Sequence, residues 1–235
     1  MNYWKIGQTP YSWNPLSETL DWSGTDSPTN FNKNKNRDDW TNVQISYKYN
    51  AAGFRTYDLV KLAGQKVNIA LGCSITEGIG LPAEQTWPSL IEQKLDYPVL
   101  NLGLGGGTTD TVARILTNIS TVYDIQTVLI MWPFVHRFEI YCPQNSKLKI
   151  HTILPQNSNL EHQWALADTM GIQRFNQNQL IVNLLAKKYK FNINQHLAVD
   201  ILDKIDHKTK GIRARDGMHP GTNMQIKIAD MILST

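Results

Sequence analysis

The sequence predicts an α/β domain built around a parallel β-sheet. Short apolar runs typical of buried strands alternate with longer stretches in which apolar residues recur at helical spacing. A strand–helix–strand succession of this kind implies right-handed crossovers, and therefore parallel strands. The length of 235 residues, with 41% hydrophobic and 18% charged residues, favours one globular domain with a sizeable core.

The regular part of the chain begins near Lys66, and the local pattern predicts each element in turn. The predicted strands are Val67–Leu71, Pro98–Leu102, Gln126–Trp132 and Ala198–Leu202. The predicted helices are Trp87–Leu95, Thr109–Ile119, Ile172–Lys188 and Thr222–Leu233. Thr86 is expected to be the N-cap of the first of these helices, with Pro88 in its first turn.

Two segments lack a regular pattern. Residues 1–55 are polar and are expected to form an irregular N-terminal arm on the main domain, residues 56–235. This arm contains Trp4, Trp13, Trp22 and Trp40. The indoles could pack the arm onto the domain or form a sugar-stacking surface, and we favour packing because tryptophan buries a large apolar area. Residues 133–170 are expected to be an insertion, and long loops often carry function.

Composition argues against several classes of protein. The net charge of +3 is small and the basic residues are scattered, so no nucleic-acid partner is expected. Neither a signal peptide nor a membrane span is indicated, which leaves the cytoplasm or a non-classical or virion-associated route. Two cysteines cannot form a disulfide framework, and the six histidines lack metal-ligand spacing. We therefore expect no metal and no cofactor, and the oligomeric state is not indicated.

Two motifs carry residues suited to nucleophilic catalysis. The first, GCSITEG, places Ser74 just past the carboxyl end of a predicted strand, where parallel sheets bind their ligands. The second, DGMHPG, places Asp216 three residues before His219 on a turn. The carboxylate can then bind one ring nitrogen and leave the other facing a hydroxyl. Each motif alone is weak, because a loop-capping aspartate beside a surface histidine would give the same letters.

A third motif, NLGLGGG, occupies Asn101–Gly107 after the second predicted strand. Glycine-rich turns before a helix present backbone N–H groups to anions. The run lacks the Gly-Lys-Ser/Thr of a P-loop and the GxGxxG order of a dinucleotide site. It fits a phosphate cradle or an oxyanion hole.

In their order along the chain, GCSITEG, NLGLGGG and DGMHPG resemble the blocks of the SGNH (GDSL-type) hydrolase family, over roughly residues 50–235. The resemblance places Ser74 as nucleophile and, from DGMHPG, Asp216 and His219 as its partners. It also implies an oxyanion hole made by the backbone N–H groups of Ser74 and Gly106. The stretch Asn50–Arg55 resembles a lead-in found in some branches. The family's fold is a flavodoxin-like three-layer α/β/α sandwich with a parallel sheet, and its members hydrolyse esters without a metal.

The chain departs from the family pattern beside the nucleophile. The aspartate of the usual Gly-Asp-Ser is Cys73 here. A thiol at this position could itself be the nucleophile. We favour Ser74, with Cys73 packing beneath the turn, because the Asp-x-x-His pair serves a serine hydroxyl in this family.

A second departure lies after the predicted strand Gln126–Trp132, at the position of the family's third block. In the family, this block contains an asparagine that donates to the oxyanion. The chain instead reads WPFVHR over residues 132–137. Either the two backbone donors suffice, or Arg137 or His136 replaces the asparagine. In the opposing interpretation Arg137 pairs with a nearby acid, such as Glu139 or Asp124.

These observations predict a serine-dependent carboxylic ester hydrolase. The expected partner is a small-molecule or carbohydrate ester, with a short acyl group such as acetate on a sugar preferred by analogy. Two alternatives stay open: an acyltransferase that uses the same triad, and a non-catalytic binding or structural protein on an esterase fold.

Overall fold

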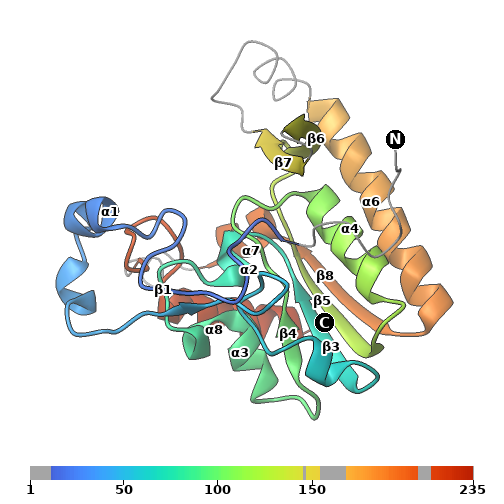
Figure 1. Cartoon of the computed structure of the whole chain (residues 1–235), viewed down its shortest axis with the longest axis horizontal. Helices are drawn as coiled ribbons and strands as arrows, with labels where there is room; N and C mark the ends of the chain where they lie inside the picture. The colour runs from blue at the N-terminus through green and yellow to red at the C-terminus, as the bar shows by residue number, and fades with distance from the viewer. Residues whose placement is uncertain (1–11, 145–146, 154–167, 206–212, 235) are drawn as a thin grey trace.

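A parallel sheet of four strands forms the centre of the computed structural model, which describes residues 12–144, 147–153, 168–205 and 213–234 (Figure 1). The strands are β3 (Lys66–Leu71), β4 (Val99–Asn101), β5 (Asp124–Trp132) and β8 (Asn192–Leu197). They lie in the order β4-β3-β5-β8. In chain order this is the 2-1-3-4 arrangement of flavodoxin-like sheets. The predicted α/β class with a parallel sheet is confirmed.

Helices cover both faces of the sheet, because the strands are apolar on both sides (Figure 1). Val128 and Ile130 of β5 point to one face, and Leu129 and Met131 point to the other. The first face carries α4 (Thr109–Ile119) and α6 (Asp168–Tyr189). The second carries α3 (Trp87–Glu92), α7 (Ala198–Lys204) and α8 (Thr222–Leu233). The three-layer α/β/α arrangement is therefore present.

Most predicted elements are present at or near their predicted bounds. The bounds of α4 and α8 coincide with the prediction, while β3, β4, β5, α3 and α6 differ from it by a few residues at one or both ends. Thr86 holds the N-cap position of α3, but its hydroxyl donates to the carbonyl of Ala83 instead of capping the helix. The main domain also contains the short helices α2 (Ser74–Glu77), η2 (Val60–Leu62) and η3 (Ala83–Gln85).

The predicted fourth strand, Ala198–Leu202, is wrong. These residues belong to the helix α7, and the strand that pairs with β5 is β8, directly before it. Ala198, Ile201 and Ile205 are buried in the core beside α8, at a spacing that suits one face of a helix. The strand β8 lies at the edge of the sheet and has the polar sequence NINQHL. The sequence Ala198–Leu202 does not reveal this helix, because a short apolar run fits a helix and a strand equally well.

The predicted insertion at residues 133–170 contains an antiparallel hairpin that the sequence analysis did not anticipate. Its strands are β6 (Phe138–Gln144) and β7 (Lys147–Ile153), with Phe138 opposite Ile153. Residues 154–167 lie outside the described part of the chain.

The described part of the N-terminal arm, residues 12–55, contains four short elements. They are β1 (Thr19–Leu20), α1 (Pro28–Lys33), η1 (Arg37–Trp40) and β2 (Tyr47–Lys48), and β1 pairs with β2. A small apolar cluster joins Trp40 and Tyr47 of the arm to Ile79, Leu81 and Ala214 of the main domain. Trp4, one of the four arm tryptophans, lies outside the described residues. In the part of the chain described here, no helix combines the length and apolar character needed to cross a membrane.

Candidate active site

The turn that carries Ser74 begins where β3 ends. Gly72 has no room for a side chain, because a Cβ there would lie 2.1 Å from Thr76 Oγ1 and 2.8 Å from the Met131 carbonyl oxygen. Cys73 is extended, fully buried and packed in the core, and Ser74 is the first residue of α2. The helix stops after one turn at Gly78, which adopts the left-handed conformation with φ 81°. The serine therefore lies at the carboxyl edge of the sheet, where ligands bind in this class of fold.

The segment Arg213–Pro220, which we call the catalytic loop because it carries the predicted partners of Ser74, folds back on itself directly before α8. The Ala214 N–H donates to the His219 carbonyl (3.0 Å), and Gly217 makes the turn with φ 71°. The Asp216 Oδ1 atom accepts the backbone N–H groups of Met218 (2.9 Å) and His219 (3.0 Å). The aspartate thus shapes its own loop as well as facing the histidine.

The structure brings Ser74, His219 and Asp216 together in one hydrogen-bonded line. Ser74 Oγ lies 2.7 Å from His219 Nε2, and His219 Nδ1 lies 2.6 Å from Asp216 Oδ2. The serine and the histidine are 145 positions apart in the sequence. They meet because the Arg215 N–H donates to the Gly80 carbonyl (2.9 Å), which joins the catalytic loop to the segment after the serine.

Burial and hydrogen bonding act in opposite directions on Asp216. Its side chain is fully buried, whereas that of His219 is 16% exposed. Burial raises the pKa of Asp216, but the hydrogen bond and the charge of His219 outweigh this effect. With further bonds from the His219 N–H and the Thr25 hydroxyl, the pKa of Asp216 falls to about 2. The carboxylate is therefore ionised at neutral pH and can fix the orientation of the imidazole ring.

The glycine-rich loop after β4 packs against the backbone beside Ser74. The Leu104 N–H donates to the Gly72 carbonyl (3.2 Å), and the Gly107 N–H closes a turn on the Leu104 carbonyl (2.8 Å). Gly106 has φ 75°, a conformation that suits glycine in the third position of a turn. A Cβ on Gly107 would lie 3.6 Å from Cys73 Cα, which shows how closely the loop approaches the turn that carries Ser74.

Glu77, which the sequence analysis did not identify, connects this loop to the arm. Its buried carboxylate accepts the Tyr49 hydroxyl (2.8 Å) and the Asn14 side-chain amide (3.0 Å) on one oxygen. The other oxygen accepts the Gly105 N–H. Burial raises the pKa of Glu77, and these three donors partly offset that rise. Nothing in the local sequence indicates this role, because all three partners are distant along the chain.

The segment at the position of the family's third block, residues 132–137, begins at the last residue of β5. Trp132 is buried, and its indole N–H donates to the Gln195 side chain (3.0 Å). The imidazole of His136 stacks on the ring of Phe134, with the ring centroids 5.7 Å apart, and the Arg137 guanidinium lies 4.9 Å from the same ring.

The two acids suggested as partners of Arg137 are placed elsewhere. The carboxylate of Glu139 forms an ion pair with Arg114 (3.0 Å) and accepts the Thr111 hydroxyl. Asp124 begins β5, whereas Arg137 follows its end, so the length of that strand separates them. A part for Arg137 or His136 in an oxyanion hole stays a prediction.

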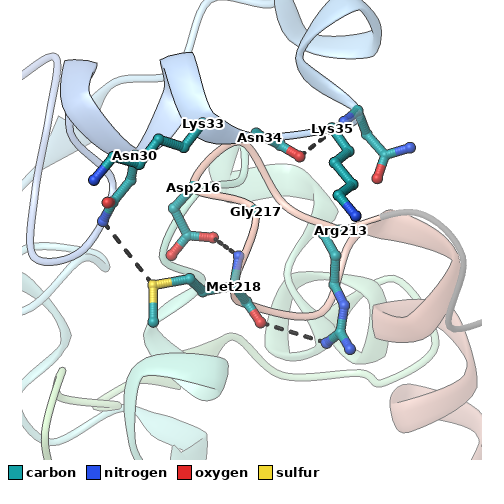
Figure 2. Close-up of a pocket in the computed structure, with 9 residues that line it drawn as sticks. Asn30, Lys33, Asn34, Lys35, Arg213, Asp216, Gly217 and Met218 are labelled. Atoms are coloured by element: carbon teal, nitrogen blue, oxygen red, sulfur yellow. Dashed lines mark hydrogen bonds between the residues drawn. The ribbon is translucent and has the colours of Figure 1, made fainter.

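A pocket of about 370 Å³ lies between α1 and the catalytic loop (Figure 2). Three cationic side chains line it, those of Lys33, Lys35 and Arg213. Of Ser74, His219 and Asp216, only Asp216 borders this pocket. The pocket therefore lies beside the catalytic loop and not over Ser74. Within the described ranges, no group of three His, Cys, Asp or Glu side chains is placed to hold a metal ion.

No protein-family model and no curated protein matches the chain. Solved structures do resemble it, and each of the following covers 72% of the chain. A lipolytic protein of the G-D-S-L family from Veillonella parvula DSM 2008 is 12% identical, with 97% of its own length covered and a TM-score of 0.37. A structure described as TesA is 18% identical, with 98% covered and a TM-score of 0.39. The acetyl xylan esterase AlAXEase is 15% identical, with 98% covered and a TM-score of 0.36. The chain is thus similar to solved lipolytic and esterase proteins at low sequence identity.

Proposed function

We propose that the chain is a serine-dependent carboxylic ester hydrolase of the SGNH type. The observation that carries this proposal is the line of two short hydrogen bonds from Ser74 through His219 to Asp216. A hydroxyl beside one imidazole nitrogen, with a buried carboxylate on the other, is the arrangement that activates serine as a nucleophile.

In the proposed reaction, Ser74 Oγ attacks the ester carbonyl while its proton moves to His219 Nε2. The ionised Asp216 holds the neutral imidazole in the required tautomer and stabilises the imidazolium that forms. The tetrahedral intermediate collapses as His219 returns the proton to the leaving alcohol oxygen. Water then attacks the acyl-enzyme by the same route, releasing the acid and regenerating Ser74.

The backbone N–H groups of Ser74 and Gly106 are the proposed oxyanion donors. Ser74 is the first residue of α2, and a first-turn N–H has no acceptor within its own helix. Gly106 belongs to the loop that packs against Cys73, next to the nucleophile. Both groups therefore belong to segments that meet at the reacting serine.

A third donor from Arg137 or His136 would replace the asparagine that the family places there. Removing a true oxyanion donor lowers kcat by about 100-fold or more with little change in KM. A structural side chain would instead lower the unfolding midpoint and leave kcat within a few-fold. If the Arg137→Ala and His136→Ala variants both keep near wild-type kcat, the backbone donors suffice.

For the substrate we propose a short acyl ester, such as an acetyl group, on a carbohydrate. Its support is Trp13, whose indole N–H donates to the Gly105 carbonyl (3.0 Å) while the side chain is 36% exposed. An exposed indole beside the proposed oxyanion loop suits stacking on a sugar ring, since aromatic faces bind apolar faces of ligands. The Trp13→Ala variant should raise KM for an acetylated sugar and leave hydrolysis of p-nitrophenyl acetate unchanged.

The reaction class is tested with p-nitrophenyl esters from acetate to long acyl chains. The wild type should hydrolyse the short esters, and the Ser74→Ala variant should have lost this activity while unfolding at the same urea concentration. Ser234→Ala, which removes an exposed hydroxyl near the C-terminus, is the matched control and should keep full activity. Turnover that survives in Ser74→Ala would contradict the assignment of the nucleophile.

A further inference from the structure

Thr25, a residue of the N-terminal arm, contacts the buried carboxylate of the aligned triad. Its hydroxyl donates to Asp216 Oδ2 (2.7 Å), the oxygen that also faces His219 Nδ1. The Thr25 oxygen lies 3.4 Å from that ring nitrogen. The other carboxylate oxygen accepts the N–H groups of Met218 and His219. Thr25 thus supplies a donor to Asp216 from outside the catalytic loop.

The arm holds Thr25 in place through the residues on either side of it. The Asn30 side-chain amide donates to the Thr25 carbonyl (2.7 Å), and the Asp26 N–H closes a turn on Ser23 (3.0 Å). The Asp26 carboxylate forms a buried ion pair with Arg215, the residue directly before Asp216 (2.6 Å). Side-chain bonds therefore join the arm to the catalytic loop at two consecutive positions, 25 with 216 and 26 with 215.

We propose that Thr25 is a positioning residue of the triad, which orients the Asp216 carboxylate toward His219 from the arm. Without Thr25, only the His219 ring would hold Oδ2, and the carboxylate could tilt about its χ2 angle together with that ring. The Thr25 hydroxyl is a second donor at Oδ2, which restrains χ2 independently of the imidazole. This inference deepens the proposed ester hydrolysis, and its kinetic test rests on that function.

Thr25 donates to Asp216 through a neutral hydroxyl, whereas several other side chains around the loop can carry a charge. His219 is the ring partner of the carboxylate on the loop itself, and Arg215 forms an ion pair with Asp26. Among the described residues, the cations that line the pocket beside the loop are Lys33 and Lys35 of the arm and Arg213 of the loop itself (Figure 2). Burial raises the pKa of Asp216, the bonds and charge of His219 lower it, and the Thr25 bond lowers it by a smaller amount. Thr25 therefore acts mainly on orientation and only secondarily on charge.

The test compares Thr25→Val, which keeps the shape and removes the hydroxyl, with Thr25→Ser, which keeps the hydroxyl. We expect Thr25→Val to lower kcat for p-nitrophenyl acetate by about 10-fold or more with little change in KM, since hydrogen bonds to charged groups are the stronger class. Thr25→Ser should recover activity to within about 3-fold of wild type. Thr19→Val, the same substitution at an exposed position of β1, is the control and should match wild type.

Two further measurements separate positioning from a general structural effect. In an Asp216→Ala background, Thr25→Val should lower kcat no further, because the group it acts through is gone. An additive loss would overturn the proposal. The low-field proton resonance of the His219–Asp216 hydrogen bond should move downfield in Thr25→Val, where Asp216 Oδ2 has one donor fewer, and stay in place in Thr19→Val.

The resonance needs no turnover, so it distinguishes the two proposals. A wild type without ester hydrolysis would contradict the proposed function, and the resonance would still decide the role of Thr25. A resonance unchanged in Thr25→Val would refute the positioning role even in an active esterase.

Discussion

The substitution Asp26→Asn should destabilise the protein strongly, because it leaves a buried guanidinium without its counter-charge. The Asp26 carboxylate accepts Nε and Nη2 of Arg215, at 3.0 and 2.6 Å, and also the Tyr47 hydroxyl at 2.6 Å. The side chain of Arg215 is only 8% exposed and lies over the ring of Trp22. Removing one partner of a buried pair typically costs about 3–5 kcal/mol.

That cost is a large part of the stability expected for a domain, which is about 5–15 kcal/mol. For a chain of this length, each kcal/mol shifts the melting temperature by about 2–4 °C, so a fall of about 6–20 °C is expected. Urea unfolding followed by circular dichroism measures the free energy of unfolding, with Asp38→Asn as the control. Asp38 lies 3.6 Å from Arg37 in an exposed pair, and such pairs contribute about 0–1 kcal/mol.

Removing both charges of the ion pair should be less harmful than removing one. A double variant, Asp26→Leu with Arg215→Met, should be more stable than Asp26→Asn, because no uncompensated charge stays buried. If Asp26→Asn costs no more than Asp38→Asn, the ion pair does not anchor the arm to the catalytic loop and does not hold Thr25 in place.

Three further predictions concern the site itself. In steady-state assays His219→Ala should lose nearly as much kcat as Ser74→Ala, whereas Asp216→Asn should lose less, because triad residues act as a unit; an additive loss in a Ser74→Ala/His219→Ala pair would contradict this. The pKa of Asp216 is lowered from 3.8 to about 2 in the folded protein. The ionised carboxylate therefore stabilises the fold fully above about pH 3.8, and this stabilisation is lost as the pH falls through about 2. The unfolding free energy of wild type relative to Asp216→Asn should therefore shrink by about 2 kcal/mol between about pH 5 and about pH 2, and a constant difference would refute the shift. Cys73→Ala should keep kcat within a few-fold, since Cys73 is a buried packing residue; a loss as large as that of Ser74→Ala would make the thiol part of the chemistry.

Much of the sheet could be predicted because its strands are continuous apolar runs. β3, β4 and β5 are buried on both faces, and such strands stand out in a sequence without any tertiary information. The strand β8 lies at the edge and has only Ile193 and Leu197 as apolar residues, so the pattern instead favours a strand at the apolar start of α7. The hairpin β6–β7 had a signal that was overlooked, the alternation of Lys147–Ile150.

The site was predictable only where its residues lie in local motifs. Ser74 follows a recognisable turn, and Asp216 and His219 lie on another. The structure brings the three residues within hydrogen-bonding distance. Thr25 and Glu77 have no such local context, because their roles depend on partners that are distant along the chain. A threonine in a polar segment and a glutamate in a one-turn helix look ordinary until the fold places their neighbours.

The measurement that tests the central claim most directly is covalent labelling with a fluorophosphonate, located by peptide mass mapping. The probe reacts with a serine whose hydroxyl is activated by a neighbouring base, whatever the natural substrate is. We predict one label on Ser74 in wild type, much slower labelling in His219→Ala, and none in Ser74→Ala. A wild type that stays unlabelled, or that carries the label at Cys73 or another residue, would contradict the account.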